Sequence, residues 1–276
     1  MRVVVVGASS FIGRALQARP ETAGWRFLGG REALADSAWL ADVDCLINCA
    51  FDGLLKREAY SAERDIDLLL ARALRAHPRA QYLMLSSRMV YGPAGADGRL
   101  HEALVPQPLN LYGSAKWQSE QAVQRLLGDQ LTVLRLSNVC GNELQAGRQS
   151  FFAMASRSLI EQGQVVLDMS PFVERDFLPV EVLATWLPLI AAQPRPGVFN
   201  LGAGQGTACG RIAQWLVEGF GEGQLLVKHL REHDPFWLDI TRATDAYAIA
   251  GVAPTQLRDY CRALGQHLRL AKEGTQ

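Results

Sequence analysis

The chain has 276 residues, of which 49% are hydrophobic, and it carries 28 basic and 28 acidic side chains. This composition supports a large buried core, while a formal net charge of zero argues against a nucleic-acid partner. No apolar run reaches the roughly 18 residues that a membrane span needs, so we expect no membrane partner. The five cysteines are scattered and share no ligand spacing with the histidines, which indicates reduced thiols, a cytoplasmic protein and no metal site.

The first segment predicts a dinucleotide-binding turn. Residues 2–6 form a short run rich in valine, which indicates a buried strand rather than a signal peptide. A glycine-containing turn and an amphipathic helix over 14–18 follow; there Gly7 permits the tight turn, Gly13 allows close packing, and the helix N-terminus faces a pyrophosphate. Ser10 replaces a middle glycine, and its hydroxyl would help to hold a phosphate. The cofactor-binding residues predicted here are Gly7, Ser9, Ser10, Phe11, Ile12 and Gly13.

The next two predicted strands bear on the choice of cofactor. A site that prefers NAD usually has an acidic residue at the end of its second strand, but the strand over 25–28 is followed by Gly29, Gly30 and Arg31. Arg31 suits a 2′-phosphate, so NADP is favoured and NAD stays possible; an arginine that is merely exposed to solvent is the simpler alternative. The strand over 43–50 ends in the small residues Cys49 and Ala50, which would let the cofactor approach closely.

The middle of the chain alternates helices and strands, which implies a doubly wound parallel sheet. Its strand over 81–85 delivers Ser86 and Ser87 to the carboxyl edge of that sheet, where open α/β sheets bind ligands. The predicted elements are a loop over 51–57 near the cleft, a helix over 62–76, the strand over 81–85, a loop over 92–110 above the site, a helix from Tyr112 to about Leu127 and a strand over 131–136.

Tyr112 and Lys116 are the candidate catalytic pair. Their spacing of four residues places both side chains on one face of a helix. A nearby cation favours the phenolate form of a tyrosine, so Lys116, together with a bound cationic nicotinamide, would let Tyr112 exchange a proton at neutral pH. Ser87 would hydrogen-bond the reacting oxygen, and the three residues would serve a carbonyl/alcohol couple. Alternatively, Tyr112 is a half-buried helix residue and Lys116 only covers apolar surface with its stem.

The alternation is less regular after Gly141. We predict helices over 150–163, 211–220 and 256–269, a helix that follows residues 175–182 and runs through Ile190, and strands over 165–169 and 198–201. The fold class is therefore α/β, a doubly wound parallel (Rossmann) sheet with a smaller C-terminal substrate-binding lid. Residues 1–141 would form the dinucleotide-binding domain, to which 174–202 return, and 142–173 and 203–276 would mainly form the lid.

The ordered motifs resemble the extended short-chain dehydrogenase/reductase family, which comprises nucleotide-sugar epimerases, dehydratases and 4-keto reductases. The likeness covers nearly the whole chain. Its motifs are the glycine turn at 7–13, Asn-Cys-Ala at 48–50, Ser-x-x-Val-Tyr-Gly at 87–92, Tyr-x-x-x-Lys at 112–116, Arg-x-x-Asn at 135–138, Arg-Asp-Phe at 175–177 and Asn-Leu-Gly-x-Gly at 200–204.

The resemblance implies that Tyr112 is the general acid/base, that Lys116 also binds the nicotinamide ribose, and that Ser87 contacts the substrate oxygen. It implies that Asn138 and Arg175 bind the diphosphate of a nucleotide sugar; an ion pair of Arg175 with Glu174 or Asp176 is the alternative. It also implies a role in polysaccharide biosynthesis and a possible homodimer.

Departures from the family pattern narrow the activity. Family 4,6-dehydratases have Asp-Glu after the catalytic hydroxyl residue, whereas Arg88 and Met89 stand there, so dehydration is not expected. The chain is short for an epimerase, and Gly29-Gly30-Arg31 resembles reductases that use NADPH. We expect reduction of a 4-keto sugar nucleotide. A nucleotide-sugar 4-epimerase with tightly bound NAD is the first alternative, and a non-catalytic NADP sensor is the second.

Overall fold

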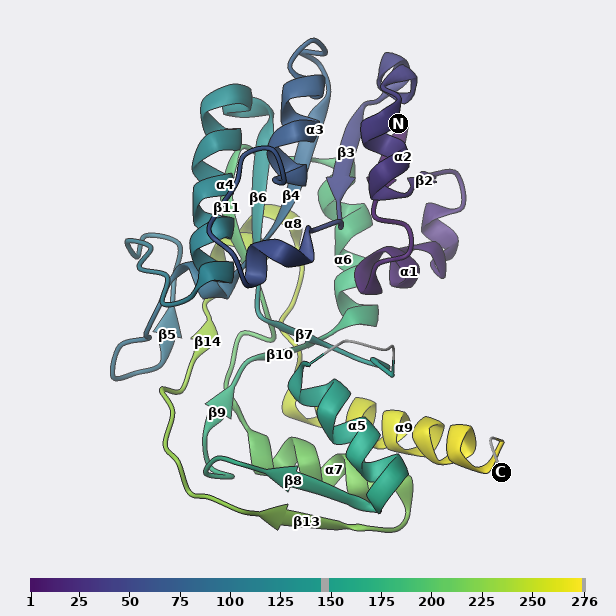
Figure 1. The fold of residues 1–276 in the computed structure, drawn as a ribbon, viewed down its shortest axis with the longest axis vertical. Helices are drawn as coiled ribbons and strands as arrows, with labels where there is room; N and C mark the ends of the chain where they lie inside the picture. Colours follow the sequence, from purple (N-terminus) through teal and green to yellow (C-terminus); the bar gives the residue numbers. More distant parts are fainter. Residues whose placement is uncertain (145–148, 275–276) are drawn as a thin grey trace.

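The computed structural model describes residues 1–144 and 149–274. Its centre is a parallel sheet of six strands in the order β11-β6-β4-β3-β1-β2 (Figure 1). The strands are β1 (Val3–Val6), β2 (Arg26–Leu28), β3 (Cys45–Asn48), β4 (Gln81–Ser87), β6 (Leu131–Leu136) and β11 (Gly197–Leu201). The predicted doubly wound parallel sheet is confirmed.

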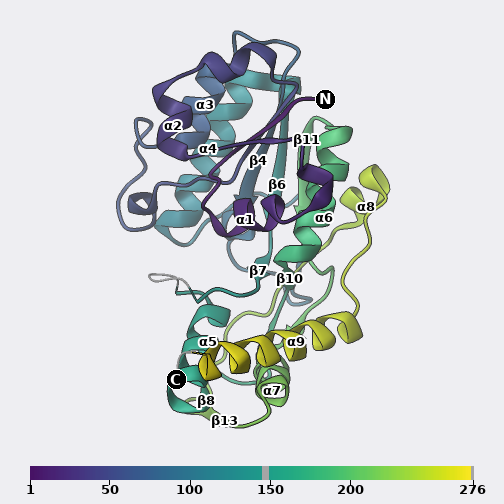
Figure 2. The same ribbon diagram turned by 90° about the vertical axis from the view of Figure 1, so that its right-hand side faces the viewer.

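Helices cover both faces of this sheet. Figure 2 shows α2 (Gly30–Ala35), α3 (Ile66–Leu74) and α4 (Leu111–Leu127) on one side, and α1 (Phe11–Gln17) and α6 (Val180–Ala192) on the other. The side chains of β1 divide accordingly: Val4 and Val6 join the core with α3, and Val3 and Val5 join the core with α6. A strand covered on both faces buries all its side chains, which explains the continuous valine run.

A smaller group of elements lies beyond the carboxyl ends of the strands (Figure 1). It contains α5 (Phe151–Gln162), α7 (Cys209–Phe220) and α9 (Pro254–Glu273), with β8 (Gln164–Leu167) parallel to β13 (Gln224–Val227). Gly219 and Gly265 allow α7 and α9 to cross closely. A Cβ on Gly219 would lie 2.0 Å from Arg262 O, and a Cβ on Gly265 would lie 2.3 Å from Leu216 O. Small residues are therefore required at this crossing.

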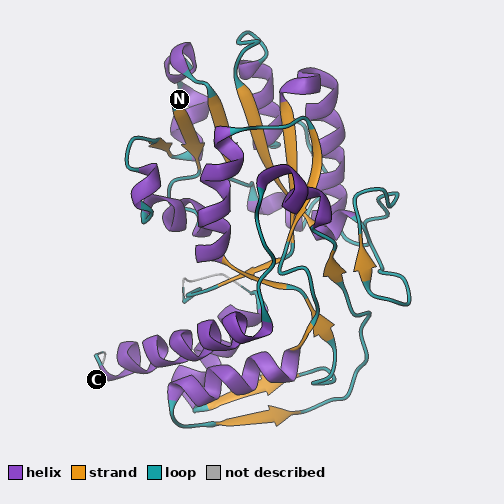
Figure 3. Ribbon diagram, turned by 180° about the vertical axis from the view of Figure 1, so that it is seen from behind, coloured by secondary structure: helices purple, strands orange, loops and turns teal. Residues whose placement is uncertain are grey.

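Three short two-stranded sheets, not predicted from the sequence, lie between or beside these two groups (Figure 3). They pair β7 (Asn138–Cys140) with β10 (Phe177–Pro179), β9 (Glu174–Arg175) with β12 (Thr207–Ala208), and β5 (Arg99–Leu100) with β14 (Trp237–Leu238). After β14, α8 (Thr241–Tyr247) returns to the main sheet, where Tyr247 lies 5.1 Å from the Phe199 ring. The segment after residue 203 thus contacts both groups, and the division into two domains stays a proposal.

Short 3-10 helices complete the chain. They are η1 (Pro20–Thr22), η2 (Ala38–Asp42), η3 (Gly53–Lys56), η4 (Arg88–Val90) and η5 (Gly128–Gln130). Among the described residues, no helix has both the length and the apolar character needed to cross a lipid bilayer.

Candidate active site

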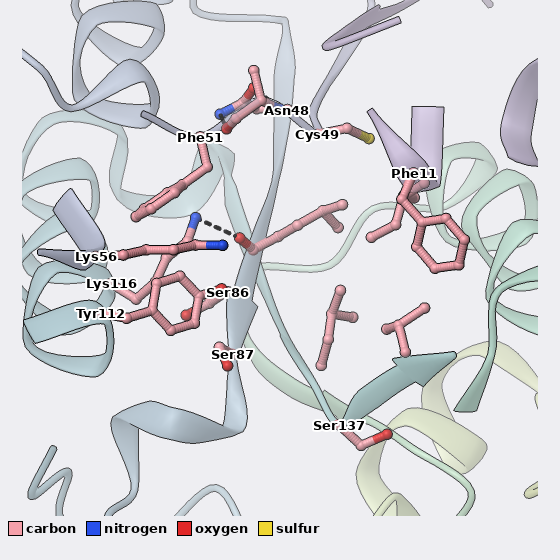
Figure 4. A pocket seen from close by; sticks show the side chains of 15 residues that line it. Phe11, Asn48, Cys49, Phe51, Lys56, Ser86, Ser87, Tyr112, Lys116 and Ser137 are labelled. Atoms are coloured by element: carbon pink, nitrogen blue, oxygen red, sulfur yellow. Dashed lines mark hydrogen bonds between the residues drawn. The ribbon is translucent and has the colours of Figure 1, made fainter. Parts of the chain in front are cut away.

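A cavity of about 250 Å³ opens where β1, β3, β4 and β6 end (Figure 4). It is lined by residues from six separate stretches of the chain. These are Phe11, Ile12, Asn48, Cys49, Ala50, Phe51, Lys56, Leu85, Ser86, Ser87, Tyr112, Lys116, Leu136, Ser137 and Val139. The catalytic trio predicted from the sequence, Ser87, Tyr112 and Lys116, therefore shares one cavity.

The glycine turn lies against the end of β3 at one side of this cavity. Gly7 has φ +95°, and a Cβ there would lie 2.7 Å from Ala50 N. A Cβ on Gly13 would lie 2.2 Å from Gly7 O. Gly7 is therefore required for its positive φ and for space, and Gly13 is required for space. The turn can then pack against the end of β3 with its backbone facing a dinucleotide.

The other predicted cofactor residues of the turn are placed differently from one another. Phe11 and Ile12 line the cavity, and Ser9 is exposed. The Ser10 hydroxyl caps α1 by accepting from Gly13 N at 3.0 Å. The Ser10 hydroxyl acts as an acceptor in this bond, so its O–H is still able to donate to a phosphate oxygen.

Cys49 and Ala50 line the same cavity, whereas Arg31 lies outside it. Burial raises the pKa of the Cys49 thiol to about 12, so this side chain is a neutral wall and not a nucleophile. Arg31 is exposed near the start of α2 and follows β2 by three residues. Gly7 N and Ala8 N both donate to Leu28 O, at 2.8 and 3.0 Å, so the glycine turn and the end of β2 are neighbours.

Lys116 is deeply buried, with only 5% of its side chain exposed. Its ammonium donates to Asp67 Oδ2 at 3.0 Å and to Leu85 O at 2.9 Å. Burial opposes the charge, but Asp67, Tyr112 and Asp65 together outweigh it, and the pKa of Lys116 is raised. An ammonium has three donors, so one is left for a group in the cavity.

Asp67 is a functional residue that the sequence reading missed. Besides Lys116, it accepts from Asn48 Nδ2 at 2.8 Å and from Tyr82 OH at 2.7 Å. A signal was present in the sequence: Asp67 shares the apolar face of its helix with Leu70 and Leu74, at spacings of three and seven residues. An acid on a buried face needs a partner, and Lys116 is that partner.

The Tyr112 ring faces the cavity beside aromatic and cationic neighbours (Figure 4). The Phe51 ring meets it edge-on, with centroids 5.2 Å apart. Lys56 Nζ lies 5.5 Å from the Tyr112 ring centroid. The predicted loop over 51–57 thus contributes directly to the site through η3, and it brings a second lysine that the sequence reading did not single out.

Ser86 and Ser87 both line the cavity but have different partners. The Ser86 hydroxyl donates to the buried carboxylate of Glu120, which also binds Arg135 Nη2 at 2.7 Å. The Ser87 hydroxyl accepts from Met89 N at 3.2 Å at the start of η4. Ser86 is therefore held by the core, while the O–H of Ser87 stays available to a ligand.

Asn138 and Arg175 line a different cavity of about 270 Å³ with Phe151, Phe152 and Phe177. Backbone pairing brings them together, because Asn138 N donates to Asp176 O at 3.2 Å. Arg175 donates to the backbone oxygen of Asp234 and forms no ion pair with the other residues that the structure describes. The alternative of an ion pair with Glu174 or Asp176 was wrong.

Asp176 is unavailable to Arg175 because backbone donors surround its carboxylate. It accepts from Ala203 N at 2.7 Å, Leu238 N at 3.0 Å and Gly204 N at 3.3 Å. It therefore joins β10 to β14 and to the turn after β11. We assign it a structural role.

Residues 3–202 match the family model described as "NAD dependent epimerase/dehydratase family". The match spans well over half of the chain, so the chain belongs to this family, and the resemblance seen in the sequence is confirmed. The description of this family names NAD as the cofactor of its members.

One curated relative is the ADP-L-glycero-D-manno-heptose-6-epimerase of Alkalilimnicola ehrlichii, 30% identical over 169 residues, or 56% of this chain and 52% of that protein. The chain thus spans about half the length of that relative.

Two solved structures share the fold over nearly the whole chain. RMD from Pseudomonas aeruginosa, complexed with NADPH, has a TM-score of 0.79 and 22% identity, covering 98% of this chain and 99% of that one. UDP-glucose 4-epimerase from Thermotoga maritima, with UDP-glucose, has a TM-score of 0.81 and 20% identity, with the same coverage.

Proposed function

We propose that this enzyme reduces a 4-keto sugar nucleotide with NADPH. The observation that carries the proposal is the single cavity that holds Ser87, Tyr112 and Lys116 beside Phe11, Ile12 and Ala50 of the dinucleotide site. The constraints on Gly7 and Gly13 fit a nicotinamide dinucleotide at this edge. When bound, the nicotinamide supplies a hydride.

Each member of the trio has a separate task. Tyr112 donates a proton to the substrate oxygen as that oxygen gains negative charge. Ser87 donates its free O–H to the same oxygen and orients it. Lys116, fixed by Asp67 and Leu85 O, stabilises the phenolate that Tyr112 becomes and offers its remaining N–H to a ribose hydroxyl.

The diphosphate would lie between Asn138 and Arg175. These side chains line the cavity of about 270 Å³, whose aromatic wall suits the nucleotide base. Arg175 also lines the neighbouring cavity of about 190 Å³ that contains Arg88. A guanidinium matches phosphate oxygens because its N–H donors form a rigid fork.

Tyr112→Phe tests the catalytic assignment. We expect turnover to fall by about 10²- to 10⁴-fold, the usual range for a general acid, with NADPH affinity little changed. The measurement is NADPH oxidation with 4-keto sugar nucleotides, together with NADPH titration. Tyr260→Phe is the control, because it too removes a single phenol hydroxyl, which donates to Glu181 at 2.6 Å, but Tyr260 is absent from the cavity lining. Equal turnover in Tyr112→Phe would overturn the assignment of Tyr112 as the general acid, whereas NADPH binding without turnover in the wild type would favour the sensor alternative.

A second candidate is a nucleotide-sugar epimerase, supported by the 30% identity to a heptose epimerase. An epimerase uses the same trio twice and consumes no cofactor overall. Purified protein that retains NAD through gel filtration and converts a sugar nucleotide without net NADPH oxidation would favour this candidate. Cofactor exchange with stoichiometric oxidation would favour the reductase.

Arg31→Ala tests the preference for NADP. If Arg31 contacts the 2′-phosphate, loss of one charge-assisted hydrogen bond should raise the KM for NADPH by about 10- to 100-fold. The KM for NADH should change less than about 2-fold, because NADH has no such phosphate. Initial rates with both cofactors measure this. Arg26→Ala, which removes an exposed arginine at the other end of β2, is the control. Equal changes for both cofactors would assign Arg31 no role in selection.

A further inference from the structure

A cluster of two arginines on one aromatic ring lies next to the catalytic serine. Arg88 directly follows Ser87 and begins η4. Its Cζ lies 3.7 Å from the Phe236 ring centroid, and Arg175 Cζ lies 5.1 Å from the same centroid. Phe236 is fixed in an apolar cluster with Val90, Tyr91, Leu100, Leu238 and Ile240. The ring therefore holds both guanidinium groups in place.

The charge of Arg88 is not offset by the protein. Its Nε is buried without a hydrogen-bond partner, and its guanidinium forms no hydrogen bond or ion pair with the residues that the structure describes. Burial and the proximity of Arg175 lower the pKa of Arg88 to about 10, so the group stays charged at neutral pH. A charged donor in this state is unfavourable until an acceptor reaches it.

The acceptor would have to come from the cavity of about 190 Å³ that Arg88 and Arg175 line together. Asn110, two residues before Tyr112, lines it too. Asp234 also contributes to the wall: its backbone oxygen accepts from Arg175, and its exposed carboxylate attracts Arg175 at longer range, so two guanidinium groups share one carboxylate. This leaves an excess of positive charge in a space adjoining Ser87.

From this arrangement we infer that Arg88 binds a carboxylate on the sugar ring, so that the substrate class is a nucleotide-activated uronic acid. The inference rests on the proposed function. Arg175 is shared with the cavity of Asn138 and is assigned to the diphosphate. Arg88 lies one residue from the group that binds the reacting oxygen, so its ligand belongs to the sugar. A planar carboxylate matches the guanidinium fork better than a hydroxyl does.

Matched ligand pairs test this inference. Dissociation constants are measured calorimetrically, with NADPH present, for UDP-glucuronate against UDP-glucose and for GDP-mannuronate against GDP-mannose. Both members of a pair have the same diphosphate, so only the carboxylate is compared. In at least one pair, the wild-type enzyme should bind the acid about 10- to 100-fold more tightly, as expected for a charge-assisted hydrogen bond.

Arg88→Met should abolish this preference and leave the affinity for the neutral sugar within about 2-fold, because methionine keeps an unbranched apolar contact with Phe236. Arg88→Lys, which keeps the charge and loses the fork, should retain part of the preference. Arg242→Met is the control: Arg242 also stacks on a phenylalanine, Phe199, at 4.7 Å, but lines a different hollow. It should behave as the wild type.

The outcomes separate the two proposals. If acid and neutral members bind equally to the wild type, the uronate inference is overturned and the proposed function stands. If Arg88→Met weakens both members alike, Arg88 binds the diphosphate and the inference is again overturned. If neither member of any pair binds, the uronate inference is overturned, and the NADPH oxidation assay decides the proposed function separately. The wild-type affinities alone decide whether the acid is preferred, even if the Arg88 variants do not fold.

Discussion

The charged side chains on the two sides of Ser87 differ in whether the folded chain provides an ion-pair partner for them. On the cofactor side, Asp67 accepts from Lys116, Asn48 and Tyr82, and both members of the ion pair are almost completely buried. On the substrate side, Arg88 and Arg175 share one ring and form no ion pair among the described residues, and Asp234 attracts only Arg175, at longer range. The first cluster pairs its ammonium with a buried carboxylate, and the second has, in the part of the chain that the structure describes, two guanidinium groups and a single exposed carboxylate, Asp234.

This difference corresponds to two tasks: one cluster fixes Lys116 in advance, and the other is available to recognise a ligand. The buried ion pair with Asp67 and the hydrogen bond to Leu85 O fix Lys116 before any ligand arrives, so no reorganisation is needed during proton transfer. An unpaired guanidinium instead lowers the stability of the free protein and gains its partner from the ligand. Substitutions in the first cluster should therefore lower the free energy of unfolding of the protein, whereas substitution of Arg88 should leave it unchanged or raise it.

The largest effect is expected at Asp67. Asp67→Ala leaves Lys116 buried without a counter-charge and should lower the free energy of unfolding by about 3–5 kcal/mol. Urea unfolding followed by circular dichroism measures this. Asp259→Ala removes the partner of Arg258 in an exposed pair, and it should change stability by less than about 1 kcal/mol. A loss at Asp67 no larger than at Asp259 would mean that the buried pair is not a fixed scaffold.

Asp176 provides an intermediate case, a buried carboxylate with backbone donors and no cation. Burial raises its pKa from 3.8 to about 6, against the pull of its hydrogen bonds. Between these values the folded chain keeps a proton that the unfolded chain releases, so this group's contribution to stability falls as the pH rises from about 4 to 6. At about 1.36 kcal/mol per unit, the decrease is about 3 kcal/mol.

Asp176→Asn isolates this contribution because asparagine does not titrate. The free energy of unfolding of the wild type relative to the variant should fall by about 3 kcal/mol between pH 4 and pH 7. Urea titrations at half-unit steps of pH measure it. Parallel curves for the two proteins would show that folding does not raise the pKa of Asp176, so that its hydrogen bonds offset its burial as fully as the ion pair offsets that of Lys116.

The sequence predicted the cofactor side better than the substrate side, and the reason is physical. Gly7, Ser87, Tyr112 and Lys116 follow parallel strands or begin helices, and the carboxyl ends of such strands meet at one edge. Local pattern therefore located them. Asp67 was missed because its partner, Lys116, lies 49 residues away, although its place on an apolar helix face was a readable signal.

The substrate side depends on contacts between distant and irregular segments. Phe236 reaches Arg88 and Arg175 from a stretch near the short strand β14, which pairs with the equally short β5. Strands of two residues have no period that a sequence pattern can reveal. The sequence thus identified Arg88 only as a departure from the family motif, and the structure was needed to show the ring and the second arginine beside it.

The smallest expected change in stability is at Arg88, and its sign is the sharpest test of the comparison. Arg88→Met removes a buried charge whose Nε has no partner and keeps an apolar chain on Phe236. The free energy of unfolding should stay within about 1 kcal/mol of the wild-type value or rise, because the lost stacking is offset by the removal of an unsatisfied donor.

Urea unfolding without ligands measures this, and Arg135→Met is the matched variant. Arg135 also stacks on an aromatic ring, Tyr91, at 4.6 Å, but it is paired with Glu120 at 2.7 Å. Arg135→Met leaves Glu120 unpaired in the core and should lose about 3–5 kcal/mol. Arg135 Nη1 is also buried without a partner among the described residues, so the two variants differ chiefly in the ion pair with Glu120. Similar losses in both variants would show that the protein stabilises the charge of Arg88 as it does that of Arg135, and the distinction between the two sides of Ser87 would no longer hold.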